Sequence, residues 1–169
     1  MFLPEDKWSP RYEPHFYTIR LKRYLVVRDP SDWPEVTAAD NYENENACSF
    51  CGVGSKKKYP AVYYEIEVLR GETQSSCLRR YSQFDSLCRH LDPRGALGLR
   101  KSLPPKTFML DSWRSNDVID ERMVGLRNFL CDALARQECV NNPVIRKFLE
   151  LDELEEVDHA ATSNWMTPP

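Results

Sequence analysis

The sequence contains no long apolar run. None of its hydrophobic stretches approaches the roughly 20 residues that a helix needs to cross a bilayer. Its first ten residues include Glu5, Asp6 and Lys7, where a secretory signal peptide would have an apolar core. Hydrophobic residues still make up 41% of the 169 positions, which is enough for a buried core. We therefore expect a globular protein whose contact with any membrane is peripheral.

The common catalytic motifs are also missing. The sequence has no GxSxG or HExxH motif, and residues 52–58 lack the GxxxxGK[ST] spacing of a phosphate-binding loop. The only histidines are His15, His90 and His159, and no two of them stand at metal-ligand spacing. We predict that the protein is not an enzyme and carries no catalytic residues and no cofactor.

Cysteine is present in an even number, six, but the pattern does not favour disulfides. There is no secretion signal, and a chain of this length does not need covalent cross-links to stabilise its fold. Several cysteines fall on apolar faces of the predicted elements, where a reduced buried thiol is the ordinary outcome. Cys48 and Cys51 resemble one knuckle of a zinc site, but two further ligands are lacking, so we predict no metal. A cytosolic, reduced protein is the better interpretation.

Positive charge is scarce overall and concentrated in one region. The formal net charge is −3, which argues against a nucleic-acid-binding protein. Residues 79–106 nevertheless carry seven Lys or Arg against two acids, a local charge of +5, whereas residues 150–169 carry six acids and no Lys or Arg. This distribution favours a confined anionic target over a polyanion.

The residue patterns predict three strands in the first half of the chain. β-Branched and aromatic residues alternate with charged ones over His15–Val27 and Ala61–Arg70, and Ser75–Tyr81 forms the hairpin partner of the second segment. We therefore expect these three strands to form an antiparallel meander. Residues 28–59 contain prolines, glycines and acids, and we interpret them as an inserted loop that could carry a protein-binding site.

Helices are expected in the second half. Apolar residues recur at helical spacing over Tyr81–Leu91 and Asp117–Arg136, and Asn142–Pro143 begins a short terminal helix with Asn as its cap. Pro93–Lys106 is predicted to be a loop, and residues 152–169 an acidic disordered tail. Strands followed by helices indicate an α+β fold.

A candidate anion-binding site emerges from three separated segments. Arg79, Arg80 and Tyr81 place guanidinium groups beside an aromatic ring where a strand ends, and arginine donates in a forked geometry that suits phosphate. Lys106 follows two prolines on a stiffened turn. Arg122 lies on the long helix beyond them. Neighbouring strand residues point to opposite faces, so only one of the two arginines need face a ligand, and we expect Arg79 to support the structure.

The order of these segments resembles the phox-homology (PX) domain, the phosphoinositide-binding module of sorting nexins. The resemblance rests on RRYxxF at 79–84, the PPK turn at 104–106 and the ERxxGLxxFL helix at 121–130. It extends from about His15 to about Leu151. It implies a PX-like three-stranded antiparallel sheet packed against a helical subdomain. We accordingly expect an N-terminal extension at 1–14, the domain at 15–151 with its inserted loop at about 28–59, and the tail at 152–169.

Transfer by position implies the role of each site residue. Arg80 would bind the 3-phosphate of phosphatidylinositol 3-phosphate, and Tyr81 would lie against the inositol ring. Lys106 would contact the 1-phosphate, and Arg122 would donate to the 4- and 5-hydroxyls.

The apolar residues that follow Lys106 are candidates for membrane insertion. They are Phe108, Met109, Leu110 and Trp113. Tryptophan favours the membrane–water boundary. The alternative is that Phe108 and Leu110 pack into the domain and only Trp113 is exposed.

The resulting functional hypothesis is a peripheral membrane protein. Binding to phosphatidylinositol 3-phosphate would recruit it from the cytoplasm to early endosomes, where it would act in trafficking or sorting. The alternative is a PX-type scaffold that binds lipid weakly or not at all and engages a protein partner through the 28–59 loop.

Overall fold

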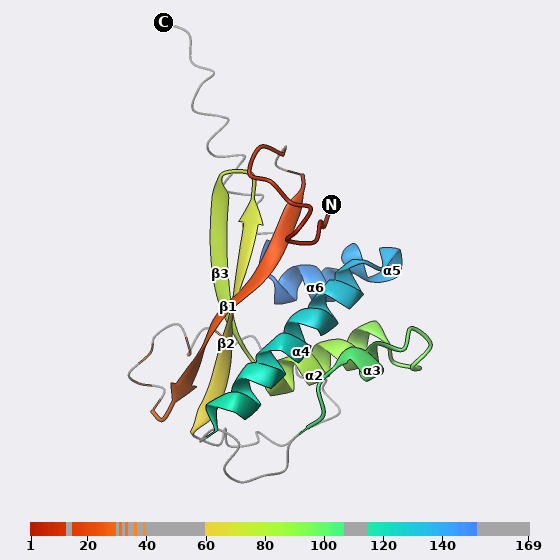
Figure 1. Cartoon of the computed structure of the whole chain (residues 1–169). Helices are drawn as coiled ribbons and strands as arrows, with labels where there is room; N and C mark the ends of the chain where they lie inside the picture. The colour runs from red at the N-terminus through yellow and green to blue at the C-terminus, as the bar shows by residue number, and fades with distance from the viewer. Residues whose placement is uncertain are drawn as a thin grey trace, which may run out of the picture.

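The computed structural model describes residues 1–12, 15–29, 31, 33, 36, 39, 60–106 and 115–151. Three strands precede the helices in this part of the chain, which confirms the predicted α+β fold (Figure 1). The elements are β1 (Tyr17–Val27), β2 (Ala61–Arg70), β3 (Thr73–Arg80), α2 (Tyr81–Leu91), α3 (Leu99–Ser102), α4 (Asn116–Leu134), α5 (Gln137–Val140) and α6 (Pro143–Phe148).

The strands form one antiparallel sheet in the order β1-β2-β3. Tyr17 pairs with Arg70 and Val27 with Ala61, and the register shifts once between Leu21 and Arg23. β2 and β3 form a tight hairpin that turns at Gly71, whose φ of 54° lies in the left-handed region that glycine adopts at little cost. The meander predicted from the sequence is therefore confirmed.

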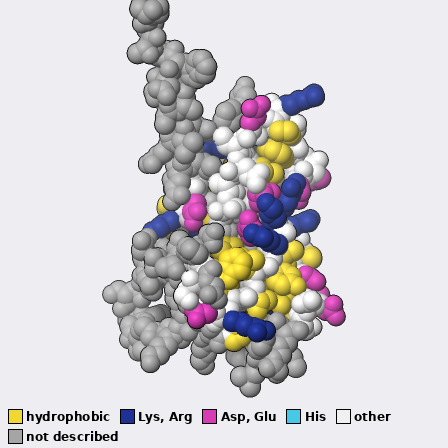
Figure 2. All heavy atoms as spheres, turned by 90° about the vertical axis from the view of Figure 1, so that its left-hand side faces the viewer, with side chains coloured by type: hydrophobic (Ala, Val, Ile, Leu, Met, Phe, Trp, Pro, Cys, Tyr) yellow, Lys and Arg dark blue, Asp and Glu magenta, His cyan; other side chains and the backbone are white. Residues whose placement is uncertain are grey.

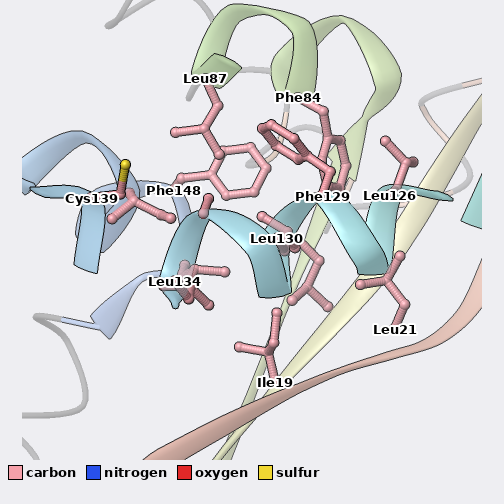
Figure 3. Close-up of a cluster of buried hydrophobic side chains, with 14 of the residues drawn as sticks. Ile19, Leu21, Phe84, Leu87, Leu126, Phe129, Leu130, Leu134, Cys139 and Phe148 are labelled. Carbon is pink, nitrogen blue, oxygen red and sulfur yellow. The ribbon is translucent and has the colours of Figure 1, made fainter. Parts of the chain in front are cut away.

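The helices cover one face of this sheet, and the main core lies between the two layers (Figure 1). Ile19 and Leu21 of β1 lie below α4, whose Leu130 faces them (Figure 3). On the other side of α4, Phe84 of α2 meets the ring of Phe148 edge to face, with the centroids 5.1 Å apart. All five side chains are buried, so the amphipathic faces predicted for α2 and α4 are the faces that form the core.

A second cluster of apolar side chains lies on the opposite face of the sheet. Tyr63 and Leu78 are buried there together with Val36 and Ala39, which come from the inserted loop after β1. Figure 2 views this side of the molecule and shows hydrophobic side chains next to basic and acidic ones. The described part of the inserted loop thus packs on the sheet.

The N-terminal residues also belong to the folded unit. Phe2 forms a parallel bridge with Tyr17, and the amide of Leu3 donates to the carbonyl of Tyr17 at 2.9 Å. The Phe2 ring is buried and lies 5.9 Å from the Tyr17 ring. Residues 1–3 therefore extend the edge of the sheet beyond β1.

The prediction of an unbroken loop over Pro93–Lys106 is wrong, because this segment contains α3. Gly98 precedes the helix with a φ of 70°, and the Asp92 carboxylate accepts hydrogen bonds from the amides of Leu97 and Leu99. A single helical turn is too short to show a hydrophobic period. The cap predicted for α6 is confirmed, since the Asn142 side chain accepts from the amide of Val144 at 2.9 Å.

Candidate functional site

Tyr81 is the centre of the candidate site. It is the first residue of α2, and its hydroxyl donates a 2.6 Å hydrogen bond to the carbonyl of Pro104. The guanidinium carbon of Arg122 lies 5.0 Å from the centroid of its ring, close enough for a cation–π interaction. One side chain therefore links the start of α2, the turn that carries Lys106, and the first half of α4.

Gly125 allows the turn to lie directly on α4. A Cβ atom at this position would come within 2.6 Å of Cγ of Pro104, so no larger residue fits unless the turn moves. Arg122 lies one helical turn before Gly125, on the same side of α4. The glycine in the GLxxFL pattern thus leaves room for Pro104, and this packing brings the PPK turn close to Arg122.

Arg122 also affects a tyrosine of the sheet. Burial raises the pKa of Tyr64 to about 12, and the positive charge of Arg122 lowers it in part. Burial is also the main cause that raises the pKa of Tyr81, and the negative charge of Asp85 raises it further. The positive charges of Arg100 and Arg122 lower it. Both tyrosines remain neutral near pH 7, so Tyr81 keeps the proton that it donates to Pro104.

Arg80 occupies the N-cap position of α2. Its φ of −87° and ψ of 159° are extended, and its amide donates a 2.6 Å hydrogen bond to the side chain of Gln83. Its guanidinium carbon lies 5.5 Å from the centroid of the Tyr63 ring, on the sheet face opposite the helices. The structure thus brings Tyr81, Arg122 and the Lys106 turn together, whereas it places the Arg80 side chain over a different ring, on the other face of the sheet.

Comparisons with known proteins identify the family of this chain. The family model described as "PX domain" matches residues 67–152. The chain belongs to the PX domain family. That match includes β3, α2, the PPK turn and α4, which are the segments that form the candidate site.

Two curated proteins and one solved structure show how this PX domain relates to others. Human sorting nexin-16 is 35% identical over 91 residues, which cover 53% of this chain and 26% of that protein. The rat serine/threonine-protein kinase Sgk3 is 31% identical over 98 residues, covering 57% of this chain and 19% of the kinase. The chain therefore matches only about a fifth to a quarter of the length of these relatives.

A designed CISK-PX domain has the same fold. Its structure superposes with a TM-score of 0.55 at 19% identity and covers 78% of this chain and 96% of its own. Together with the family match, this confirms a three-stranded sheet packed against helices. PX domains are non-catalytic modules that generally bind phosphoinositides and serve membrane trafficking.

Arg79 serves the structure of this PX domain, as predicted. Its side chain is 1% exposed and points away from Arg80, toward α6. Nε donates to the carbonyl of Phe148 at 2.9 Å, one terminal nitrogen donates to the carbonyl of Leu78 at 2.9 Å, and the other pairs with Glu150 at 2.7 Å. Sheet and terminal helix are thereby joined by a single side chain.

Two more arginines near the site are engaged with a buried acid. Asp85 is 4% exposed and pairs with both Arg89 and Arg100. Their charges are therefore partly neutralised within the protein. Sequence reasoning counted both in the local charge of +5. Asp85 and Arg89 stand four residues apart on α2, but nothing in the spacing indicated the pair with Arg100.

Several predicted features lie outside the described residues. They are the insertion residues Phe108, Met109, Leu110 and Trp113, the pair Cys48 and Cys51, and the tail at 152–169. Among the residues that the structure does describe, no group of His, Cys, Asp or Glu could hold a metal ion. No helix in those same ranges is both long enough and apolar enough to span a bilayer.

Proposed function

We propose that this PX domain binds phosphatidylinositol 3-phosphate and recruits its protein to endosomal membranes. The observation that carries the proposal is the meeting of three segments at Tyr81, where Arg122 lies over the ring and Pro104 accepts from the hydroxyl. Lys106 follows Pro104 by two residues, which supports a site that Lys106 shares with Arg122 of α4. Family membership supports a phosphoinositide as the ligand, and related sorting nexins support an endosomal role.

Each cation has a task that fits its chemistry. Arg80, half-buried at the start of α2, would bind the 3-phosphate through its forked donors, and Lys106 would contact the 1-phosphate as a point charge. Arg122 would donate to the 4- and 5-hydroxyls, leaving no space for phosphates there. Selectivity for the 3-phosphate would then arise by exclusion of more highly phosphorylated headgroups.

The headgroup alone gives moderate affinity. Charge-assisted hydrogen bonds contribute about 1.5 to 3 kcal/mol each, so three or four of them less the ordering costs give a dissociation constant on the order of micromolar. Phe108, Met109, Leu110 and Trp113 follow Lys106 closely in the chain. We propose that at least one of them enters the lipid interface and prolongs residence on the membrane.

Liposome co-sedimentation against each phosphoinositide tests the proposal. The wild type should pellet selectively with vesicles that contain phosphatidylinositol 3-phosphate, and Arg80→Ala should abolish pelleting. Arg94→Ala is the matched control, because Arg94 is an exposed arginine of the same basic stretch that has no part in the proposed site. It should bind as the wild type does.

Two outcomes would contradict the proposal. One is equal pelleting of the wild type and Arg80→Ala, and the other is no pelleting of the wild type with any phosphoinositide. In the second case a protein-binding scaffold becomes the better candidate. The observation that favours it is a cavity of about 280 Å³ on the outer face of the sheet, lined in part by Leu25, Trp33 and Leu78.

A further inference from the structure

Gln83 connects the inserted loop to the headgroup site. Its side chain is 1% exposed, and both ends of its amide are used. The oxygen accepts from the amide of Arg80 at 2.6 Å, and the nitrogen donates to the carbonyl of Ala39 at 2.6 Å. A buried amide that is satisfied on both sides fixes the two groups it joins, since loss of either bond would leave an unpaired polar group.

Apolar packing makes a second connection between the same two segments. Val36 and Ala39 are 0% and 3% exposed and pack in one cluster with Tyr63 and Leu78. The Arg80 guanidinium lies over the outer edge of that cluster, 5.5 Å from the centroid of the Tyr63 ring. The inserted loop therefore contacts the ring on which Arg80 rests as well as the side chain that caps its amide.

We propose that Val36 and Ala39 of the inserted loop are a working part of the headgroup site, and that Gln83 is the positioning residue that couples them to Arg80. The inference rests on the proposed function and adds a route for its control. When Val36 and Ala39 lose their contacts with the sheet, Ala39 no longer accepts from Gln83 and the Tyr63 ring loses these two apolar neighbours. Arg80 then loses both constraints, and lipid affinity falls without any change in the cations themselves.

Two substitutions separate this role from general stability. Gln83→Glu keeps an oxygen that can accept from the Arg80 amide but removes the donor to Ala39. Val36→Ala removes two methyl groups from the contact between loop and sheet. Val68→Ala is the matched control for the latter, because Val68 is also 0% exposed but lies in the main core under the helices.

The experiment measures binding to vesicles that contain phosphatidylinositol 3-phosphate. Urea unfolding at the temperature of the assay first checks that every variant is fully folded without denaturant. Gln83→Glu and Val36→Ala should each bind about threefold to tenfold more weakly than the wild type, the loss expected for one hydrogen bond or small contact. Val68→Ala should bind as the wild type does, although it loses comparable stability. Wild-type affinity in both Gln83→Glu and Val36→Ala would overturn the inference.

A readout without lipid distinguishes failure of this inference from failure of the proposed function. The ¹H–¹⁵N resonances of the Arg80 amide and of its Nε should shift in Gln83→Glu and Val36→Ala and stay in place in Val68→Ala. If the wild type binds no phosphoinositide, the proposed function fails. The Arg80 resonances then still show whether Gln83 couples the inserted loop to Arg80. Unchanged Arg80 resonances in both Gln83→Glu and Val36→Ala would refute the coupling.

Discussion

At the scale of single residues, the two neighbouring arginines at the end of β3 have opposite tasks. Alternation along the strand sends Arg79 to the inner face, where Tyr64 is its cross-strand partner, and Arg80 to the outer face with Tyr63. The inner position is closed to solvent, so a ligand could not reach the Arg79 guanidinium. Strand alternation thus gives the Arg79 side chain a structural role and leaves only Arg80 for the proposed binding of a headgroup.

We expect Arg79→Ala to lower the free energy of unfolding by about 3 kcal/mol. The substitution removes the hydrogen bonds that the guanidinium donates to the carbonyls of Phe148 and Leu78 and its ion pair with Glu150, and breaking such a buried arrangement is costly. The free energy of unfolding of Arg79→Lys should lie between those of the wild type and Arg79→Ala, because one ammonium cannot reach all three acceptors of the guanidinium. Urea unfolding followed by tryptophan fluorescence measures the change.

Arg94→Ala, at an exposed position, should stay within about 0.5 kcal/mol of the wild type. Folded Arg79→Lys should still bind lipid, because this side chain does not face the site. An Arg79→Ala protein with wild-type stability but no lipid binding would show that the assignment is wrong.

At the scale of elements, sequence periodicity was most informative where an element is long and one of its faces is buried. The predicted bounds of α2 match the structure because Phe84, Leu87, Cys88 and Leu91 recur at helical spacing and all enter the core. Periodicity could not predict α3 or α5, since each contains only four residues. The cap of α2 was also hidden, because Arg80 stands where a capping box usually has Ser or Thr, so Gln83 gave no recognisable signal.

The contact between α4 and the PPK turn leads to a prediction at this scale. Gly125→Ala should destabilise the protein by about 1 to 3 kcal/mol, although alanine favours helix more than glycine by about 1 kcal/mol. The new methyl group would overlap Pro104 and push the turn away from α4. Lipid affinity should fall as well, because Lys106 moves with the turn.

Val124→Ala provides the control at the next position of the same helix. Val124 is 57% exposed, so alanine there should leave stability equal or slightly higher and lipid binding unchanged. Thermal unfolding and vesicle sedimentation of both variants make the comparison. Wild-type stability and affinity in Gly125→Ala would mean that the turn does not depend on this contact.

At the scale of the whole molecule, the features that sequence reasoning missed are contacts between distant segments. Phe2 joins Tyr17 at the edge of the sheet, Ala39 accepts from Gln83, and Arg79 holds Phe148. Each pair consists of residues with ordinary local patterns, and nothing in either local pattern identifies the other. The resemblance implied a role for Arg80, but it could not show that the Arg80 side chain rests on Tyr63.

The distribution of charge over the whole chain predicts how membrane binding depends on salt and lipid. The net charge of −3 repels an anionic surface as a whole, and Asp85 holds two of the nearby arginines. We therefore expect the attraction to a membrane to be short-ranged and confined to the proposed headgroup site. Vesicles of phosphatidylserine alone should retain little protein, even at 0.1 M salt, where the screening length is about 10 Å.

With phosphatidylinositol 3-phosphate present, raising the salt to about 0.5 M should weaken binding only several-fold, because contacts inside a site are screened less than long-range attraction. A protein held by general positive potential would instead bind phosphatidylserine and lose affinity by orders of magnitude. Sedimentation across this salt range, with each vesicle type in parallel, distinguishes the two modes. Strong retention on phosphatidylserine alone would show that surface charge, rather than recognition of one headgroup at Arg80, Lys106 and Arg122, holds this PX domain on membranes.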